Sequence, residues 1–243
     1  MVAASERKHR YGQDRAKVRF QEHRHPPCPL CERSETSWFY RDPVRGSAAR
    51  RDYYKCGLCH LIFVPPEQRL SPEVEIQRYQ MHENRPDDPE YRKFLNRMVQ
   101  PLDRVLKPNS NGLDFGAGPG PTLNVMLEER GHTVSLYDAF FAPDLTVFDR
   151  TYDFITSTET VEHLFEPRME LDRLWSCLKP GGWLGIMTQR VDQAPSFATW
   201  HYKNDDTHVL FFSEKSFRWL CRRWDAELEF YGRDVVLYQK PAV

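Results

Sequence analysis

The chain has 243 residues, of which 40% are hydrophobic and 28% charged, and its formal net charge is −1. This length has room for one large domain and a small one, and the apolar content is enough for a core. No run approaches the roughly 20 apolar residues of a membrane span. The charged first residues lack the apolar stretch of a signal peptide. We therefore expect a cytoplasmic protein without a membrane partner.

The charge is unevenly distributed along the chain. Residues 1–60 contain 13 Lys and Arg against 7 Asp and Glu, and the remaining residues contain 21 against 28. Residues 1–27 are rich in Arg, Lys, Gln and His, which predicts a disordered basic arm. Such an arm can contact nucleic acid or be a solvated tail, and both interpretations stay open.

Two C-x-x-C pairs follow, Cys28 with Cys31 and Cys56 with Cys59. Four thiolates at this spacing suit tetrahedral zinc, because each pair supplies two ligands from one tight turn. Disulfides are the alternative, which a cytoplasmic location disfavours. Four ligands leave no open coordination position, so we expect a structural zinc. His60 is then a bystander.

The segment between the two pairs has strand-like patterns at residues 38–40 and 52–55. The module over residues 28–66 therefore resembles a zinc ribbon. Cys177 and Cys221 lie in helical apolar patterns and are interpreted as core thiols.

Residues 67–108 predict a helical linker or lid. Ser71-Pro72-Glu73 is typical of a helix start, and we expect this helix to run to about Met81. A second helix begins at Pro89, and Pro101 should kink or split it.

The central motif is LDFGAGPG at residues 113–120, a strand end that enters a glycine-rich turn before a helix. Glycines let the backbone turn tightly and touch a ligand. Asp138 closes the next apolar run, where a carboxylate can accept hydrogen bonds from a ribose diol. A nucleotide-binding Rossmann domain would also explain these features. However, Asp114 adds negative charge that suits a sulfonium better than a pyrophosphate, and no Gly-Lys-Ser/Thr ending follows.

Three further motifs occur in order after Asp138: YDFITS at residues 152–157, ETVEHL at 159–164 and LKPGGWL at 178–184. Together they resemble the class I S-adenosylmethionine (SAM) dependent methyltransferases. The resemblance implies a cofactor site made by Asp114, Phe115, Gly116, Ala117, Gly118, Gly120, Asp138, Ala139, Phe140, Thr158 and Glu159. It also implies that the segment before the core covers the cofactor mouth, where Tyr79, His82 and Asn84 would touch SAM or substrate. Alternatively, these three residues only cap and connect two helices.

The alternation of elements predicts an α/β methyltransferase domain over residues 109–243, with a mostly parallel sheet and helices on both faces. A C-terminal antiparallel hairpin completes it, as the resemblance implies. We expect strands at 112–115, 133–137, 152–157, 183–188, 226–231 and 235–239, and helices at 122–130, 168–178 and 213–224.

The family pattern is shortened after Asp138, because only 14 residues separate it from Asp153. The third strand is reduced to Leu145–Phe148 or is missing. Phe140 then either stacks on adenine or packs in the core.

Catalytic candidates are His163, His208 and Glu159. Together with Glu162 they resemble the metal site of small-RNA 2′-O-methyltransferases, and a similar segment occurs in ubiquinone-pathway O-methyltransferases. Such a set would bind a divalent ion that holds a substrate hydroxyl pair. Alternatively, His163 or His208 is a general base without metal.

His201 and Tyr202 are further substrate-side candidates. No N-P-P-Y tetrapeptide follows the fourth strand, which argues against the amino-methylating enzymes that use it. No Pro-Cys dipeptide is present either, which argues against cytosine C5 methylation.

The sequence thus favours a SAM-dependent methyltransferase that O-methylates a small molecule. The alternative substrate is RNA, contacted by the ribbon and the basic arm. A non-catalytic SAM-binding scaffold is the alternative of another class.

Overall fold

The computed structural model describes residues 25–43, 50–81 and 84–242. The predicted basic arm, except for residues 25–27, and His82 lie outside these residues. Within the described part of the chain, no helix is long and apolar enough to cross a membrane.

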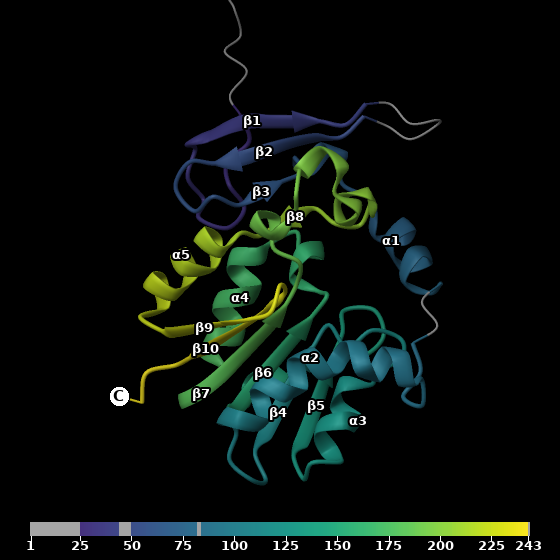
Figure 1. Cartoon of the computed structure of the whole chain (residues 1–243), viewed down its shortest axis with the longest axis vertical. Coiled ribbons are helices and arrows are strands. Elements are labelled where there is room, and N and C mark those ends of the chain that lie inside the picture. The colour runs from purple at the N-terminus through teal and green to yellow at the C-terminus, as the bar shows by residue number, and fades with distance from the viewer. Residues whose placement is uncertain (1–24, 44–49, 82–83, 243) are drawn as a thin grey trace, which may run out of the picture.

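A six-stranded sheet forms the centre of the described chain, in the order β5-β4-β6-β7-β10-β9 (Figure 1). Neighbours from β5 to β7 are parallel, and β10 pairs antiparallel with both β7 and β9. The strands are β4 (Asn111–Phe115), β5 (Thr133–Tyr137), β6 (Tyr152–Thr158), β7 (Leu178–Met187), β9 (Glu227–Tyr231) and β10 (Val235–Gln239). The α/β architecture with a C-terminal hairpin is confirmed.

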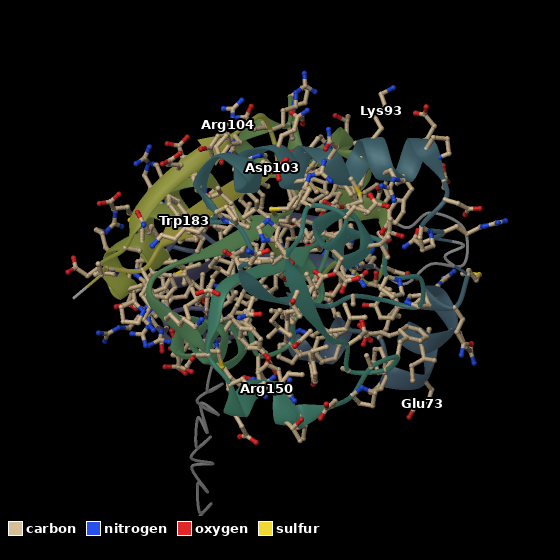
Figure 2. All side chains as sticks on the ribbon, turned by 90° about the horizontal axis from the view of Figure 1, so that it is seen from below. Glu73, Lys93, Asp103, Arg104, Arg150 and Trp183 are labelled. Atoms are coloured by element: carbon tan, nitrogen blue, oxygen red, sulfur yellow. The ribbon has the colours of Figure 1, made fainter. Side chains whose placement is uncertain are left out.

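Helices cover both faces of this sheet because each has an apolar face to bury. On one face, α2 and α3 share a core with the sheet that includes Leu95, Met98, Leu127 and Phe154. The polar face of α2 carries Lys93, Asp103 and Arg104, which point outward in Figure 2. A second core underlies α4 and α5 and includes Leu171, Leu174, Phe217 and Leu220. The helices are α1 (Pro72–Tyr79), α2 (Pro89–Val105), α3 (Leu123–Glu128), α4 (Pro167–Ser176) and α5 (Glu214–Trp224).

Of the two alternatives for the third strand, the structure has the second: residues Leu145–Asp149 form the 3-10 helix η2, and no third strand is present in the described sheet. Phe148 of η2 packs on Tyr137 with ring centroids 4.7 Å apart, which covers the edge of the sheet instead. Pro101 does not split α2. The buried apolar stripe of α2 packs on the sheet, and the free energy gained by this packing exceeds the cost of the one backbone hydrogen bond that a proline cannot donate. Strand β7 already begins at Leu178, where it pairs with Tyr152 before a register shift.

The N-terminal module forms a second sheet, and one of its strands comes from the C-terminal half of the chain. Among the described residues its order is β1-β2-β3-β8. The members are β1 (Thr36–Arg41), β2 (Asp52–Cys56), β3 (Ile62–Phe63) and β8 (Leu210–Phe211). Strand β3 pairs antiparallel with β8, and the cysteines share one core with Phe211 and Phe212. Strand β8 and a common core therefore join the module to the part of the chain that forms the six-stranded sheet (Figure 1).

Candidate functional site

The four paired cysteines converge as predicted. Their Sγ atoms all lie within 4.8 Å of one another, and all four side chains are buried. The Sγ atoms of Cys28 and Cys59 are 3.4 Å apart, as are those of Cys31 and Cys56. A disulfide needs about 2.05 Å, so these contacts are not disulfides. Zn–S bonds of about 2.3 Å in a tetrahedron place the sulfurs about 3.8 Å apart, so this donor set fits zinc.

The two cysteine turns share one backbone conformation. Glu32 and His60, each directly after the second cysteine of a pair, both have a φ of 61°. The backbone N–H groups of Leu58 and Cys59 donate to Sγ of Cys56 at 3.3 and 3.4 Å. Donation to sulfur favours the thiolate form that a metal needs. His60 is part of the turn and is not among the clustered metal-ligand side chains.

A cavity of about 590 Å³ opens at the carboxyl ends of β4, β5 and β6. Polar loops meet there because parallel strands end at the same edge of a sheet. Of the predicted cofactor residues, those that line it are Phe115, Gly116, Ala117, Gly118, Asp138, Ala139, Phe140, Thr158 and Glu159. His163, His208, Tyr79 and Asn84 line it as well.

The glycine-rich loop presents bare backbone to this cavity. Gly116 and Gly118 have φ values of 81° and 68°, which side chains adopt at a cost. A Cβ on Gly116 would lie 2.2 Å from Cγ2 of Thr160, whereas nothing lies within 4 Å of a Cβ built on Gly118. The open space at Gly118 is part of the cavity, so a ligand can touch the main chain there.

The two predicted acids take different positions. Asp138 lines the cavity, and its carboxylate accepts N–H bonds from Gly118, Phe140 and Phe141 at 2.9 to 3.1 Å. It therefore holds both loops as well as facing any ligand. Asp114 is buried behind the glycine loop and does not line the cavity; it accepts a hydrogen bond from Oγ1 of Thr156 at 2.8 Å. Burial, assisted by the charge of Asp138, raises the pKa of Asp114 to about 6 against the effect of that bond.

Gly120 does not line the cavity either, because it packs against the carbonyl oxygen of Asn84. Glu159 lies at the end of β6 in a left-handed conformation with a φ of 48°. Burial, with the nearby charge of Glu162, raises the pKa of Glu159.

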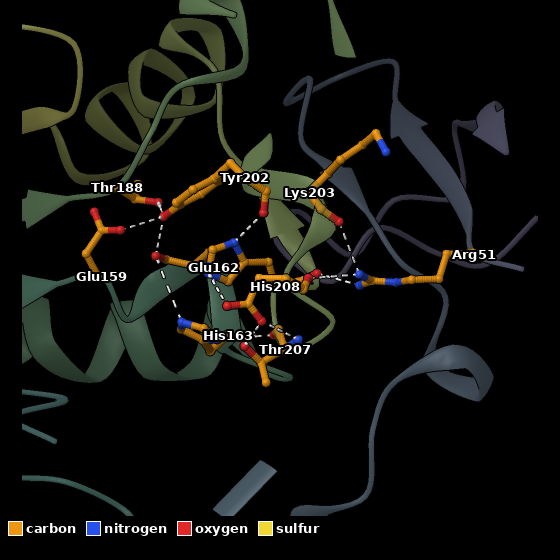
Figure 3. Close-up of polar contacts among 10 residues, drawn as sticks. Arg51, Glu159, Glu162, His163, Thr188, Tyr202, Lys203, Thr207 and His208 are labelled. Atoms are coloured by element: carbon orange, nitrogen blue, oxygen red, sulfur yellow. Dashed lines mark hydrogen bonds and ion pairs between the residues drawn. The ribbon is translucent and has the colours of Figure 1, made fainter. Parts of the chain in front are cut away.

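Three of the four predicted metal ligands cluster beside the cavity (Figure 3). Potential ligand atoms of Glu162, His163 and His208 lie within 4.8 Å of one another. Nδ1 of His163 lies 3.2 Å from the carbonyl oxygen of Thr207, and Nδ1 of His208 lies 2.7 Å from that of Tyr202. Because a carbonyl oxygen only accepts, the Nδ1 atom of each histidine is the donor in its contact, which orients both imidazoles.

Glu162 is fully buried at the centre of this cluster. Its Oε1 accepts from the hydroxyl of Tyr202, and among the described residues its Oε2 has no hydrogen-bond partner. The Tyr202 oxygen is also 3.3 Å from Oε2 of Glu159, so it connects the two carboxylates, and Glu159 itself stands outside the cluster. Burial lowers the pKa of His163 to about 4, so its imidazole is neutral.

Sequence reasoning missed part of this site. The missed residues that also line the cavity include Glu75, Tyr91, Phe94, Thr160, Leu164, Phe165 and Asp205. For Glu75 a signal existed, because it stands four residues before Tyr79 and so shares its helix face. Of the substrate-side candidates, Tyr202 is buried in the cluster, and His201 is exposed and does not line the cavity.

Residues 81–229, more than half of the chain, match the family model described as a methyltransferase domain. They contain the glycine loop, Asp138, Glu159 and the histidine cluster. The chain belongs to the class I SAM-dependent methyltransferases. No curated protein matches this methyltransferase.

Solved structures resemble this methyltransferase in fold. A SAM-dependent methyltransferase of Thermotoga maritima is 18% identical over 62% of this chain and 95% of its own, with a TM-score of 0.40. A phosphoethanolamine N-methyltransferase of Haemonchus contortus is 18% identical over 55% of this chain and 38% of its own, with a TM-score of 0.43. An O-methyltransferase family protein of Burkholderia thailandensis is 15% identical over 69% of this chain and 63% of its own, with a TM-score of 0.45.

The family implies SAM as cofactor, and the residues present fit it. The open space at Gly118 admits a ligand against the main chain, and Asp138 faces the same space. The cavity walls carry no Lys or Arg in the described chain, and carboxylates suit a cationic sulfonium.

Proposed function

We propose that this methyltransferase moves a methyl group from SAM to a hydroxyl of a small molecule. The observation that carries the proposal is the Glu162–His163–His208 cluster beside the glycine loop. A buried carboxylate oxygen without a partner is costly, and two imidazoles with fixed Nδ1 protons point to a ligand between them.

One end of the cavity carries the residues that would hold the cofactor. The loop from Gly116 to Gly118 and the Asp138 carboxylate would hold SAM, and Phe140 and Thr158 line the same space. When bound, SAM supplies a methyl group on a positively charged sulfur. Asp114, fixed behind the loop by Thr156, adds negative charge that favours this cation.

The acceptor end would orient the hydroxyl and take its proton. A divalent ion held by Glu162, His163 and His208 matches their mixed nitrogen and oxygen ligands and would position the hydroxyl oxygen. Without such an ion, Nε2 of His163 or His208 would instead accept the proton of the hydroxyl as a general base, and Glu159 lines the same cavity. Alignment of acceptor and methyl group is the main requirement of an in-line displacement.

The walls of the cavity favour a small acceptor over RNA. They are formed by aromatic side chains such as Tyr79, Phe140 and Phe165 and by carboxylates such as Glu75 and Asp205. RNA phosphates would be repelled by these carboxylates. An RNA substrate would instead show binding that weakens steeply with salt, since each phosphate contact adds to the slope.

Thermal unfolding with and without S-adenosylhomocysteine tests the cofactor assignment. A ligand at a hundred times its dissociation constant adds about 2.7 kcal/mol to the native state. We expect this stabilisation in the wild type and in Asp149→Ala, an exposed acid outside the cavity, and its loss in Asp138→Ala. Absence of stabilisation in the zinc-loaded wild type would contradict the proposed cofactor site.

Methyl transfer itself is then followed with SAM labelled on the methyl group and a metabolite extract as acceptor source. Label in small molecules whose methyl carbon has the NMR chemical shift of a methyl ether supports O-methylation, and label in RNA supports the alternative substrate. Cofactor binding without any label transfer would support a scaffold and contradict catalysis.

A further inference from the structure

Helix α1 (Pro72–Tyr79) buries an unexpected residue. Its Val74 is 39% exposed, whereas Glu75 is 6% exposed and is the one residue of this helix that is buried. Helices in soluble proteins normally bury their apolar positions. Here the helix turns a carboxylate into the cavity and leaves a valine in solvent, so apolar packing does not explain why Glu75 is its buried residue.

The Glu75 carboxylate is poorly compensated within the described chain. Its Oε1 is buried and makes no hydrogen bond there. The neighbouring cation is Arg69, but its guanidinium donates to the carbonyl oxygens of Val64 and Phe165 and lies over the Phe165 ring. Burial raises the pKa of Glu75 to about 7, and Arg69 only partly opposes this. A buried carboxylate of this kind costs stability unless a ligand compensates it.

The surroundings of Glu75 are aromatic and negative. Tyr79 follows one turn later, with its ring 5.5 Å from that of His163 and 5.8 Å from that of Phe140. Burial raises the pKa of the Tyr79 hydroxyl, and so do the charges of carboxylates around it, with Glu75 and Asp205 the largest of these. Asp205 stands at the cavity edge, 3.8 Å from Nε2 of His208.

We propose that Glu75, with Tyr79 and Asp205, forms a cation subsite that binds a protonated nitrogen of the methyl acceptor. An ammonium group would give the buried Oε1 its missing donor, and the faces of Tyr79 and Phe140 would add cation–π attraction. The subsite lies at the histidine end of the cavity, because Tyr79 connects α1 to His163. Glu75 is thus a specificity residue that selects amine-bearing acceptors. This inference rests on the proposed function, of which it names the substrate class.

Three aromatic probes of similar size test the subsite: benzylamine, benzyl alcohol and benzoate, which are positive, neutral and negative at neutral pH. Each is titrated at millimolar concentration, where fragments bind, into the full chain saturated with S-adenosylhomocysteine, and the unfolding temperature is followed. We expect benzylamine to raise it and the other two to leave it unchanged. The Glu75→Gln variant should bind benzylamine about tenfold more weakly, which corresponds to about 1.4 kcal/mol.

Glu73→Gln is the matched control. It removes the same charge from the same helix, but its side chain points outward (Figure 2), so benzylamine should bind as in the wild type. Equal binding of benzylamine and benzyl alcohol, no binding of benzylamine, or equal benzylamine binding by wild type and Glu75→Gln would each overturn the subsite.

The failure of this inference is distinguishable from that of the proposed function. S-adenosylhomocysteine alone should stabilise Glu75→Gln as it does the wild type, because Glu75 lies outside the cofactor loops. The probe comparison in the wild type needs no variant, so a folding defect of Glu75→Gln would not leave the subsite untested.

Discussion

Arg51 donates hydrogen bonds to the carbonyl oxygens of Asp205 and His208, at 3.0 and 2.5 Å. Arg51 belongs to the ribbon module, whereas His208 belongs to the Glu162–His163–His208 cluster of the methyltransferase domain (Figure 3). Lys203 adds a second link, because its buried Nζ pairs with Asp42 at 2.5 Å. The segment that carries His208 is thus held by the ribbon on one side and by Glu162 through Tyr202 on the other.

Arg51→Ala should weaken divalent-ion binding at the cluster by about tenfold or more, the usual effect of losing a group that orients a metal ligand. Isothermal titration of Mn²⁺ into zinc-loaded protein measures this. Stabilisation by S-adenosylhomocysteine should not change, because the glycine loop does not contact Arg51. Arg50→Ala, at the neighbouring exposed arginine, is the control. Equal Mn²⁺ affinity in Arg51→Ala and wild type would show that the ribbon does not position His208.

Loss of the zinc that we expect at the four paired cysteines should destabilise the whole chain. Cys56→Ser removes the sulfur that accepts two backbone N–H bonds, and the β3–β8 pairing transmits the damage to the shared core. We expect loss of bound zinc, measured with a colorimetric chelator, and one unfolding transition lowered on the order of 10 °C. Cys221→Ser, at a half-buried thiol outside the cluster, should keep its zinc. A separate transition for the ribbon, with the methyltransferase part unaffected, would contradict this coupling.

The parts of the fold that the sequence predicted well depend on contiguous residues. The glycine loop, the strand ends at Asp138 and Glu159 and the two cysteine pairs each need only local chemistry. The β3–β8 pairing was not predictable, because two strands of two residues each have no recognisable period and are 147 residues apart in the chain, counted from Phe63 to Leu210. The 3-10 helix at residues 145–149 was missed as well, because Phe148 is placed by its packing on Tyr137.

In the candidate site, too, the residues of a contiguous motif were predictable, whereas those brought in from distant parts of the chain were not. His163 follows a recognisable motif, but His208 comes close only because Tyr202 and Thr207 supply the carbonyl oxygens that orient both imidazoles. Glu159 was grouped with Glu162 by spacing, and both carboxylates contact the Tyr202 hydroxyl, but of the two only Glu162 lies in the cluster with the histidines.

The histidine cluster should bind one divalent ion in addition to zinc. Titration of Mn²⁺ or Co²⁺ into the zinc-loaded wild type should reveal this site, and Glu162→Gln should lose it, because an amide oxygen is a weaker ligand than a carboxylate. His201→Gln is a control on the same segment, since this imidazole is exposed and lies outside the cluster. If the wild type binds no second ion, His163 and His208 act without metal.

Glu75→Gln should stabilise the protein at alkaline pH while it weakens binding of the cationic probe. The pKa of Glu75 is raised by burial to about 7 from an ordinary 4.5, so the folded state favours the neutral carboxyl. The stability that this shift contributes is therefore fully present below pH 4.5 and is lost as the pH rises through about 7. Arg69 and Tyr79 face Glu75 from its own segment, and His163, His208 and Asp205 face it across the cavity.

Glutamine carries no charge, so the variant avoids this loss. We expect it to be more stable than the wild type by about 1–3 kcal/mol at pH 8 and equally stable near pH 4. Chemical denaturation at the two pH values measures the difference, and Glu73→Gln should show no gain at pH 8, because its hydrogen bond to Ser71 lowers the pKa of Glu73 and favours the charged form. A Glu75→Gln variant that is less stable at pH 8 would mean that Glu75 is compensated inside the protein, by Arg69, and is not held ready for a ligand. Stabilisation together with weaker benzylamine binding is the combination expected of a residue retained for recognition at the expense of stability.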